Sequence, residues 1–278
     1  MIKKVLSIHS SRGGTGKTVI ATNLAAIYAI KGLNVALLDL DFRSPSLVDV
    51  FSSALKDPVR HWLNDLLDGR CKAEQALTNV SEAYGLKGKL LLGLANPAIE
   101  AIRNMIEKSR AWEVTAVKRL FSLRSRLFDD MDIDCCIIDT SPGIQYTSVN
   151  AVVSSDVSVV VATLDSLELK GLENMLVELY DAFAKRTVVL INKVFPETRA
   201  WSSDEQKILI GKMEKVLQHP VIGIIPCYCD VLQAKRTSLL AVDKPYHPFL
   251  RNLEEVAEKL ESIKEENVEE DILCKAKS

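Results

Sequence analysis

The chain has 278 residues, 47% hydrophobic and 26% charged, and its formal net charge at pH 7 is −2. This composition is typical of a globular protein and excludes global disorder, a scaffold held by its six cysteines, and a wholly basic nucleic-acid binder. No apolar run approaches the roughly 18 residues of a membrane helix, and the N-terminal apolar stretch breaks at His9, too early for a signal peptide. We therefore expect a cytoplasmic protein.

Continuous apolar runs recur along the chain between segments with helical spacing. Such runs predict strands buried on both faces of a parallel sheet, joined by crossover helices. The expected fold is a doubly wound α/β fold, with a mostly parallel sheet of about 7–8 strands flanked by helices. The predicted strands are Lys4–His9, Val35–Asp39, Lys89–Leu94, Ile133–Asp139, Val157–Thr163, Val188–Asn192 and Val221–Ile225.

The stretch from Ser52 to Asp132 is the least regular part of the chain. It contains one predicted strand and several predicted helices, among them His61–Leu67 and Trp112–Phe128. A last helix is predicted at Phe249–Lys264, with its apolar residues on one face. We expect one domain over residues 1–264 and an acidic, flexible tail over residues 265–278.

A glycine-rich loop follows the first predicted strand and precedes a helical pattern. It reads Ser11-Arg12-Gly13-Gly14-Thr15-Gly16-Lys17-Thr18. Glycines let the backbone aim its N–H groups inward, and the helix N-terminus adds the positive end of a dipole, so the loop predicts an anion cradle. Lys17 is placed to reach the β- and γ-phosphates, and the Thr18 hydroxyl to bind Mg²⁺.

Carboxylates follow two other predicted strands. Asp39 and Asp41 end the second strand, and the two-residue period puts them on one side of the sheet's carboxyl edge, where α/β folds bind ligands. Asp139 ends the fourth strand and is followed by Thr-Ser-Pro and Gly143. An apolar strand that ends in aspartate is the Walker B pattern.

Together, these motifs resemble those of the MinD/ParA ATPases, a family of the SIMIBI class of P-loop NTPases with a deviant Walker A loop. Asn23-Leu24-Ala25 on the following helix fits the same family. The resemblance implies an ATP-dependent homodimer. It also implies that Asp39 and Asp139 hold the Mg²⁺ shell, that Asp41 orients the attacking water, and that the N–H of Gly143 senses the γ-phosphate.

Arg12 departs from the family pattern, which has a signature lysine at this position. In the family that lysine reaches the partner's nucleotide across the dimer. Arginine keeps the charge but offers a planar fork of donors and is not equivalent to lysine. Two interpretations remain: Arg12 acts in trans as an arginine finger, or it is a surface arginine with no such role.

The sixth predicted strand indicates which nucleotide is bound. It ends in Asn192-Lys193-Val194-Phe195, and a guanine site would need a carboxylate where Phe195 stands. Asn192 offers the donor and acceptor that adenine requires, and in the family the matching asparagine contacts adenine. Pro226 and Cys227 resemble the family's second loop on the adenine side and are predicted walls. The sequence therefore favours ATP over GTP.

The segment Arg110–Arg126 is locally basic. It is interpreted either as a helix that covers the sheet with a solvated face, or as a docking surface for an acidic partner, a membrane or DNA, the last as a local, non-specific contact. The acidic end of the chain lacks the basic, amphipathic pattern of a membrane anchor.

We therefore predict a slow, Mg²⁺-dependent ATPase, with Lys17, Asp41 and Arg12 as catalytic residues. It would be stimulated by a protein partner and would position or partition a cargo such as a division protein, DNA or a surface apparatus. Two alternatives stay open: an ATP-dependent ligase or phosphotransferase on the same scaffold, and a module that binds ATP without turnover.

Overall fold

One eight-stranded sheet forms the centre of the structure, a computed structural model that describes residues 3–183, 185–195, 203–233 and 239–263. The strand order is β3-β4-β2-β5-β1-β6-β7-β8, and all neighbours are parallel except β3 and β4. The strands are β1 (Lys4–His9), β2 (Val35–Leu40), β3 (Leu77–Asn79), β4 (Leu90–Gly93), β5 (Cys135–Thr140), β6 (Val157–Ala162), β7 (Arg186–Val194) and β8 (Val221–Pro226). The predicted doubly wound, mostly parallel α/β fold is confirmed.

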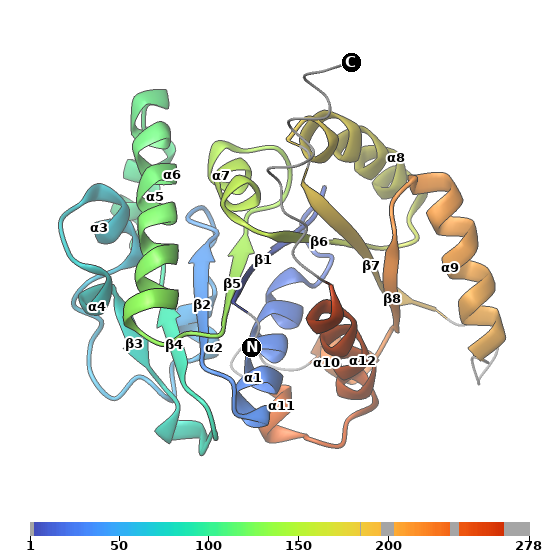
Figure 1. The fold of residues 1–278 in the computed structure, drawn as a ribbon, viewed down its shortest axis with the longest axis horizontal. Helices are drawn as coiled ribbons and strands as arrows, with labels where there is room; N and C mark the ends of the chain where they lie inside the picture. Colours follow the sequence, from blue (N-terminus) through green and yellow to red (C-terminus); the bar gives the residue numbers. More distant parts are fainter. Residues whose placement is uncertain (1–2, 184, 196–202, 234–238, 264–278) are drawn as a thin grey trace.

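Helices connect the strands and cover both faces of the sheet (Figure 1). The α-helices are α1 (Lys17–Lys31), α2 (Leu47–Val50), α3 (Leu63–Asp68), α4 (Ala73–Ala76), α5 (Ile99–Ile106), α6 (Arg110–Ser125), α7 (Tyr146–Ser154), α8 (Ser166–Met175), α9 (Ser203–Leu217), α10 (Cys229–Gln233), α11 (Leu240–Asp243) and α12 (Pro248–Ser262). A 3₁₀ turn, η1 (Glu82–Tyr84), and two π-helical segments, η2 (Arg126–Asp130) and η3 (Leu176–Asp181), complete the elements.

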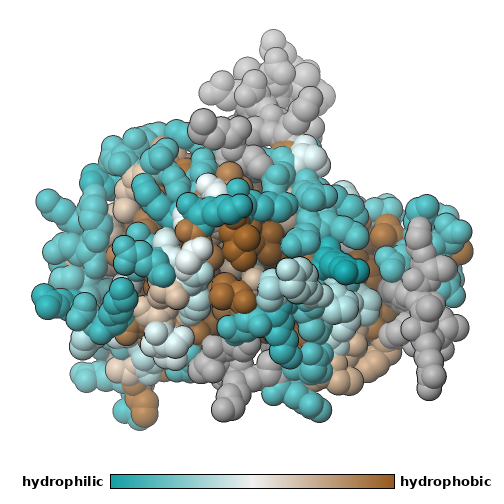
Figure 2. Space-filling model, turned by 90° about the horizontal axis from the view of Figure 1, so that it is seen from below, coloured by the Kyte–Doolittle hydropathy of each residue, from teal (hydrophilic) through white to brown (hydrophobic). Residues whose placement is uncertain are grey.

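Alternate residues of each buried strand face two different helix layers. On β2, Val35 and Leu37 pack with residues of α1 and α12, whereas Ala36 and Leu38 pack with residues of α3 and α6. Since successive side chains of a strand point to opposite faces, a strand buried on both sides must be apolar throughout. This explains the unbroken apolar runs of the sequence. Seen from below, hydrophilic residues cover most of the surface and apolar residues gather near the middle of that face (Figure 2).

The edge of the sheet formed by β3 and β4 contains the irregular region of the chain. The three-residue strand β3 pairs antiparallel with β4, and α3 is joined to the end of β4 by the bond from the N–H of Leu63 to the carbonyl of Leu94. The predicted helix Trp112–Phe128 is the α-helix α6 continued by the π-helical segment η2.

The central strands end at one edge, and this edge positions the site. Register pairs Asp39 of β2 directly with Asp139 of β5. The loops after β1, β2 and β5 therefore begin side by side, as expected at the switch point of a doubly wound sheet.

Among the described residues, no helix is both long and apolar enough to cross a lipid bilayer. The predicted tail, residues 265–278, lies outside the described residues, as does Lys264 of the predicted last helix.

Candidate nucleotide-binding site

A cavity of about 580 Å³ opens at the carboxyl edge of the sheet, between the loop after β1, the loops after β2, β5 and β8, and the end of β7. It includes Gly13, Gly14, Gly16, Lys17 and Thr18 from the predicted phosphate loop. Its other lining residues are Val19, Thr22, Asn23, Asp41, Arg43, Ser44, Ser46, Val50, Ser141, Pro142, Gln145, Asn192, Lys193, Pro226, Tyr228, Val231, Leu232, Leu240 and Phe249.

The phosphate loop owes its shape to two glycines in the left-handed region. Gly14 has φ +84°, and Gly16, the N-cap of α1, has φ +100°. Side chains rarely adopt such φ values, so glycine is required where the loop turns into the helix. The loop also holds two buried hydroxyls, those of Ser11 and Thr15, that have no hydrogen-bond partner among the described residues.

Two side chains at the end of β7 hold this loop in place. The amide Nδ2 of Asn192 donates to the carbonyl of Thr15 at 2.8 Å, and Nζ of Lys193 donates to the carbonyl of Gly14 at 2.6 Å. A Cβ atom at Gly16 would lie 2.5 Å from the amide nitrogen of Asn192. Asn192 therefore supports the loop with its donor, while its Oδ1 takes part in no hydrogen bond with the described residues.

Lys17 is buried beneath the loop. Its Nζ donates to the Ser10 hydroxyl at 2.9 Å. Burial lowers the pKa of Lys17, and the negative charges of Asp139, Asp41 and Glu168 oppose this shift. The carboxylates thus favour the charged form of Lys17, and a buried cation that lines a cavity can meet an anionic ligand there.

Oxygen donors suited to a divalent cation lie next to Lys17. The Thr18 hydroxyl donates to Oδ2 of Asp139 at 2.6 Å, while Oδ1 of Asp139 is buried without a partner. Asp39 is fully buried beside it and accepts from the N–H groups of Asp41, Ser46 and Leu47. Burial raises the pKa of Asp139 to about 7, and burial together with Asp139 raises that of Asp39.

This donor set fits Mg²⁺. An unpartnered carboxylate oxygen, a hydroxyl and a second carboxylate are the hard ligands that Mg²⁺ prefers. No group of three or more His, Cys, Asp or Glu side chains among the described residues is arranged as a metal site. Mg²⁺ commonly takes one or two carboxylates from a protein and completes its shell with water and phosphate oxygens.

Asp41 lies at the mouth of the cavity. Its Oδ1 accepts from the Ser141 hydroxyl at 2.8 Å and from the N–H of Ser44 at 3.2 Å. The carboxylate thus joins the loop after β2 to the loop after β5, and its Oδ2 has no hydrogen bond with the described residues.

Gly143 and Arg12 do not line the cavity, although the sequence places both in the site. The N–H of Gly143 donates to the carbonyl of Ser10 at 2.8 Å. Arg12 is exposed, and its guanidinium forms no hydrogen bond or ion pair with another described residue. Asp39, Asp139, Ser11 and Thr15 lie beneath the loops rather than in the lining.

The base side of the cavity differs from expectation at one residue. Pro226 and Tyr228 line the cavity, whereas the predicted wall Cys227 does not. The N–H of Cys227 donates to the carbonyl of Val194 and extends the ladder between β7 and β8. Side chains alternate along such a ladder, so Cys227 faces away from the side taken by its two neighbours.

Sequence reasoning missed Lys193, Tyr228 and Arg43. Lys193 adopts φ +57°, a conformation unusual for a residue other than glycine, and this turns the strand end toward the loop. Tyr228 was recognisable as an aromatic residue in the predicted base loop. Arg43, exposed beside Asp41, followed a recognised motif without forming part of it.

The basic segment Arg110–Arg126 is largely engaged within the molecule. Arg119 donates to the carbonyl of Leu67, Arg124 pairs with Asp156 at 2.7 Å, and Arg126 pairs with Glu74. Of its predicted basic residues, only Arg110 and Lys118 are without such contacts among the described residues. The interpretation as a covering helix with a solvated face gains support from these contacts.

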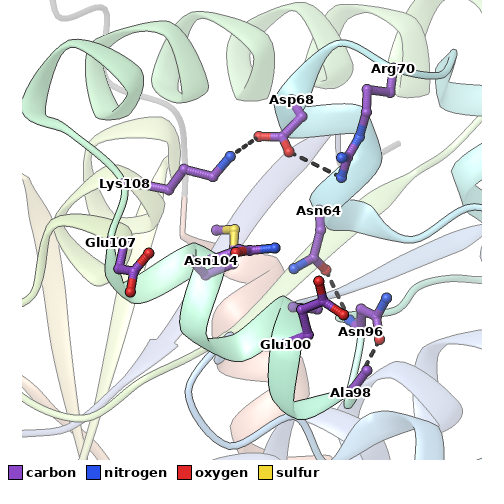
Figure 3. A pocket seen from close by; sticks show the side chains of 11 residues that line it. Asn64, Asp68, Arg70, Asn96, Ala98, Glu100, Asn104, Glu107 and Lys108 are labelled. Carbon is purple, nitrogen blue, oxygen red and sulfur yellow. Dashed lines mark hydrogen bonds and ion pairs between the residues drawn. The ribbon is translucent and has the colours of Figure 1, made fainter.

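A second cavity, of about 390 Å³, lies between α3 and α5 (Figure 3). Asp68 binds Lys108 at 2.6 Å and Arg70 at 3.0 Å on its upper wall in that view. The Oδ1 of Asn64 accepts from the N–H of Asn96 at the opposite wall. The charges of Asp68, Arg70 and Lys108 are thus satisfied by one another.

Comparison with known proteins gives a consistent result. A family model described as "AAA domain" matches residues 3–190. Septum site-determining protein MinD of Helicobacter pylori is 28% identical over 230 residues, 80% of this chain and 77% of that protein.

Solved structures share the fold. MinD from Pyrococcus horikoshii complexed with Mg-ADP superposes with a TM-score of 0.71 at 20% identity, over 93% of this chain and 96% of that one. A ParA family ATPase from Chlorobium tepidum gives 0.68 at 20% identity, over 93% and 99%.

Proposed function

Because this chain belongs to the MinD/ParA family of P-loop ATPases, we propose that it is an ATP-dependent dimerisation switch that positions or partitions a cargo. The observation that carries the proposal is the buried, unpartnered Oδ1 of Asp139, next to the Thr18 hydroxyl and Lys17. A buried carboxylate oxygen without a donor is costly unless a cation completes its environment. The sheet holds this oxygen next to Thr18, which lines a cavity large enough for a nucleotide.

Thr18 and Asp139 would hold Mg²⁺, with Asp39 supporting its shell. The ion supplies charge neutralisation on the phosphates of the bound nucleotide. Lys17 binds the phosphates from below, and the loop N–H groups bind them from the front. The MinD structure from Pyrococcus horikoshii is a complex with Mg-ADP, which supports this arrangement.

Asp41 orients the water that attacks the γ-phosphate. Its Oδ1 is fixed by Ser141 and Ser44, which leaves Oδ2 to accept a hydrogen bond from water. Holding the nucleophile in line is the main task of the protein in phosphoryl transfer. Asn192 and Pro226 contact the adenine, with Oδ1 of Asn192 free to accept from its amino group.

Arg12 acts across the dimer. It is exposed at the start of the loop and forms no ion pair with the described residues, so its charge is available to a partner's nucleotide. Arginine fingers contribute roughly 10³–10⁵ in rate in other NTPases. A protein partner that stabilises this arrangement would stimulate the otherwise slow turnover. We place the protein in the cytoplasm, and we take residues 1–264 as one domain.

Light scattering coupled to size-exclusion chromatography tests the switch. The proteins are wild type, Asp41→Ala, Arg12→Ala and, as a matched control, Arg110→Ala, each with Mg²⁺ and either ADP or ATP. We expect monomers with ADP, a lasting Asp41→Ala dimer with ATP, and no Arg12→Ala dimer. An Asp41→Ala protein that stays monomeric with ATP would contradict the proposal.

Phosphate release and added ligands separate the alternatives. Release equal to that of buffer would indicate a module that binds without turnover, and phosphorylation of an added small acid would indicate a ligase or phosphotransferase. A DNA contact would depend on Arg110 and Lys118, and Arg110→Ala with Lys118→Ala should then abolish binding to a non-specific duplex at low salt.

A further inference from the structure

His9, the last residue of β1, lies fully buried between the loop after β5 and the outer segment η3. Its Nε2 is 3.0 Å from the carbonyl oxygen of Gly143. Its Nδ1 is 2.5 Å from the hydroxyl of Tyr180, and the two rings are 6.1 Å apart. One imidazole therefore contacts two elements that are distant in sequence.

The partners determine which tautomer of His9 is present. A carbonyl oxygen can only accept, so Nε2 must carry the proton that binds Gly143. Burial, aided by the charge of Lys17, lowers the pKa of His9 to about 4, so the ring is neutral near pH 7 and Nδ1 has a free lone pair. Tyr180 therefore donates to Nδ1, and burial raises the pKa of Tyr180, which keeps its proton in place.

Gly143 is held on both sides by parts of the nucleotide site. Its N–H donates to the carbonyl of Ser10. Its carbonyl accepts from His9, from the Ser148 hydroxyl at 2.8 Å and from the N–H of Gln145 at 3.1 Å. Its φ is +74°, in the left-handed region that glycine occupies easily. The N–H and the carbonyl of Gly143 belong to adjacent peptide groups that meet at its Cα, so the carbonyl that His9 holds fixes one side of the hinge about which the N–H must turn to leave Ser10 and bind a phosphate.

Tyr180 carries this contact into the outer layer. It is buried in η3, where it packs in one cluster with Leu176 and with Val160 and Val189 of the sheet. The same segment exposes Val177 at the surface. A change in the hydrogen bond of Tyr180 would therefore act on η3, a segment with one face at the protein surface.

We propose that His9 is a positioning residue that fixes the carbonyl of Gly143 and links this loop to Tyr180, so that nucleotide-dependent movement reaches η3. This rests on the proposed ATP switch in one respect, namely the expectation from the sequence that the N–H of Gly143 responds to the γ-phosphate. The tautomer of His9 does not depend on it.

The first measurement is the nitrogen NMR spectrum of the histidine side chains, without nucleotide. His9→Gln assigns the signals of His9. We expect a neutral ring protonated at Nε2 from pH 8 to about pH 5. A ring protonated at Nδ1, or a cationic ring at pH 7, would overturn the proposal.

Two substitutions at His9 separate its two contacts. The side-chain nitrogen of glutamine lies as many bonds from Cα as Nε2, so His9→Gln keeps a donor for Gly143. The oxygen of asparagine matches Nδ1, so His9→Asn keeps an acceptor for Tyr180. We expect His9→Asn to lower kcat about 5-fold, the equivalent of one hydrogen bond, with KM for ATP within twofold. Equal kcat in both variants would contradict the positioning role.

Hydrogen exchange tests the link to η3. In wild type we expect exchange at residues 176–181 to differ between ADP and a non-hydrolysable ATP analogue, and in Tyr180→Phe to lose this difference. Tyr28→Phe is the matched control, because it removes another buried hydroxyl, which donates to the carbonyl of Ala257 at 3.2 Å. A Tyr180→Phe protein that keeps the wild-type difference would refute the link.

Calorimetry with ATP on wild type distinguishes this result from failure of the proposed function. Wild type that binds no ATP would contradict the ATPase proposal. Wild type that binds ATP but shows no exchange difference at 176–181 would contradict only the inference about His9 and Tyr180.

Discussion

Single side chains in this site do more than one task, and Asp41 shows how. Its Oδ1 accepts hydrogen bonds from the Ser141 hydroxyl and from the N–H of Ser44, so this oxygen joins two loops. The other oxygen, Oδ2, remains available to bind water. The sequence predicted the position of Asp41 from the two-residue period of a strand. It did not predict Ser141 as the partner, because that contact depends on the alignment of β2 with β5.

Asp41→Asn should lower the rate of ATP hydrolysis by about 10²–10⁴-fold, because the amide keeps the shape but loses the charge that orients and polarises water. ATP affinity should change less than tenfold. The measurement is steady-state phosphate release together with calorimetric binding. Asp49→Asn, an exposed acid on α2, is the control and should behave as wild type. A variant with undiminished turnover would remove Asp41 from the mechanism.

His9 makes stability depend on pH. Its pKa of about 4 in the folded protein lies below the 6.5 of a free histidine, so the unfolded chain binds this proton more tightly. The free energy of unfolding should therefore decrease as pH falls from 6.5 to 4, by up to about 3 kcal/mol. Urea unfolding at several pH values gives the free energy of unfolding at each pH, and this free energy should depend less steeply on pH in His9→Gln than in wild type. The same pH dependence in both proteins would show that His9 is not the group that titrates.

At the scale of elements, the phosphate loop depends on β7 as much as on its own glycines. Asn192 and Lys193 donate to its carbonyls, so the loop is supported from a strand that is remote in sequence. A glycine-rich pattern predicts that the loop can turn tightly. It does not predict which neighbour fixes the turn.

Gly16→Ala should weaken nucleotide binding at least tenfold. The new Cβ would meet Asn192, and a side chain at φ +100° costs roughly 1–2 kcal/mol by itself. In an Asn192→Ala background the same change should cost less, since only the backbone strain remains. Calorimetric affinities for ADP in the four proteins of this cycle measure the coupling. Additive losses would show that Asn192 and Gly16 act independently.

The elements themselves were largely predictable. All seven predicted strands are present, with ends shifted by up to two residues, because each is a long apolar run covered on both faces. Strand β3 was not predicted, since three half-exposed residues at an edge carry little hydrophobic pattern. The π-helical segments were also not predicted, because their wider turns depend on tertiary packing.

The position of a site residue was predictable where it lies near the carboxyl end of a strand, as for Asp39, Asp139 and Asn192. Contacts between loops were not, because they require the strand order and register. Cys227 shows the difference: its place after β8 was clear, but which neighbour faces the cavity depends on how far the ladder continues.

At the scale of the molecule, the site draws on loops from both halves of the sheet. Residues from Gly13 to Phe249 line one cavity. A nucleotide bound there would contact residues from both halves of the sheet, on either side of β1, and would link the two halves.

Thermal unfolding should consequently be a single transition, and nucleotide binding should shift this whole transition to higher temperature. ADP with Mg²⁺ at about 100 times its dissociation constant should add about 2.7 kcal/mol to the free energy of unfolding and raise Tm by about 5 °C. Replacing Mg²⁺ by a chelator should reduce this increase in Tm. Scanning calorimetry checks this, with nucleotide-free buffer as the reference. Two separate transitions, with only one shifted by ADP, would contradict a single domain.

The central place of β1 also has a consequence for biosynthesis. This strand leaves the ribosome before the rest of the sheet, yet it lies between β5 and β6, whose residues follow more than a hundred positions later. At 5–20 residues per second, the newly made strand waits roughly 6–30 s for its neighbours. During that time its apolar side chains are available to chaperones, and the nucleotide site is not yet assembled. Protease digestion of ribosome-stalled chains should show protection of residues 4–9 only once β6 has left the exit tunnel.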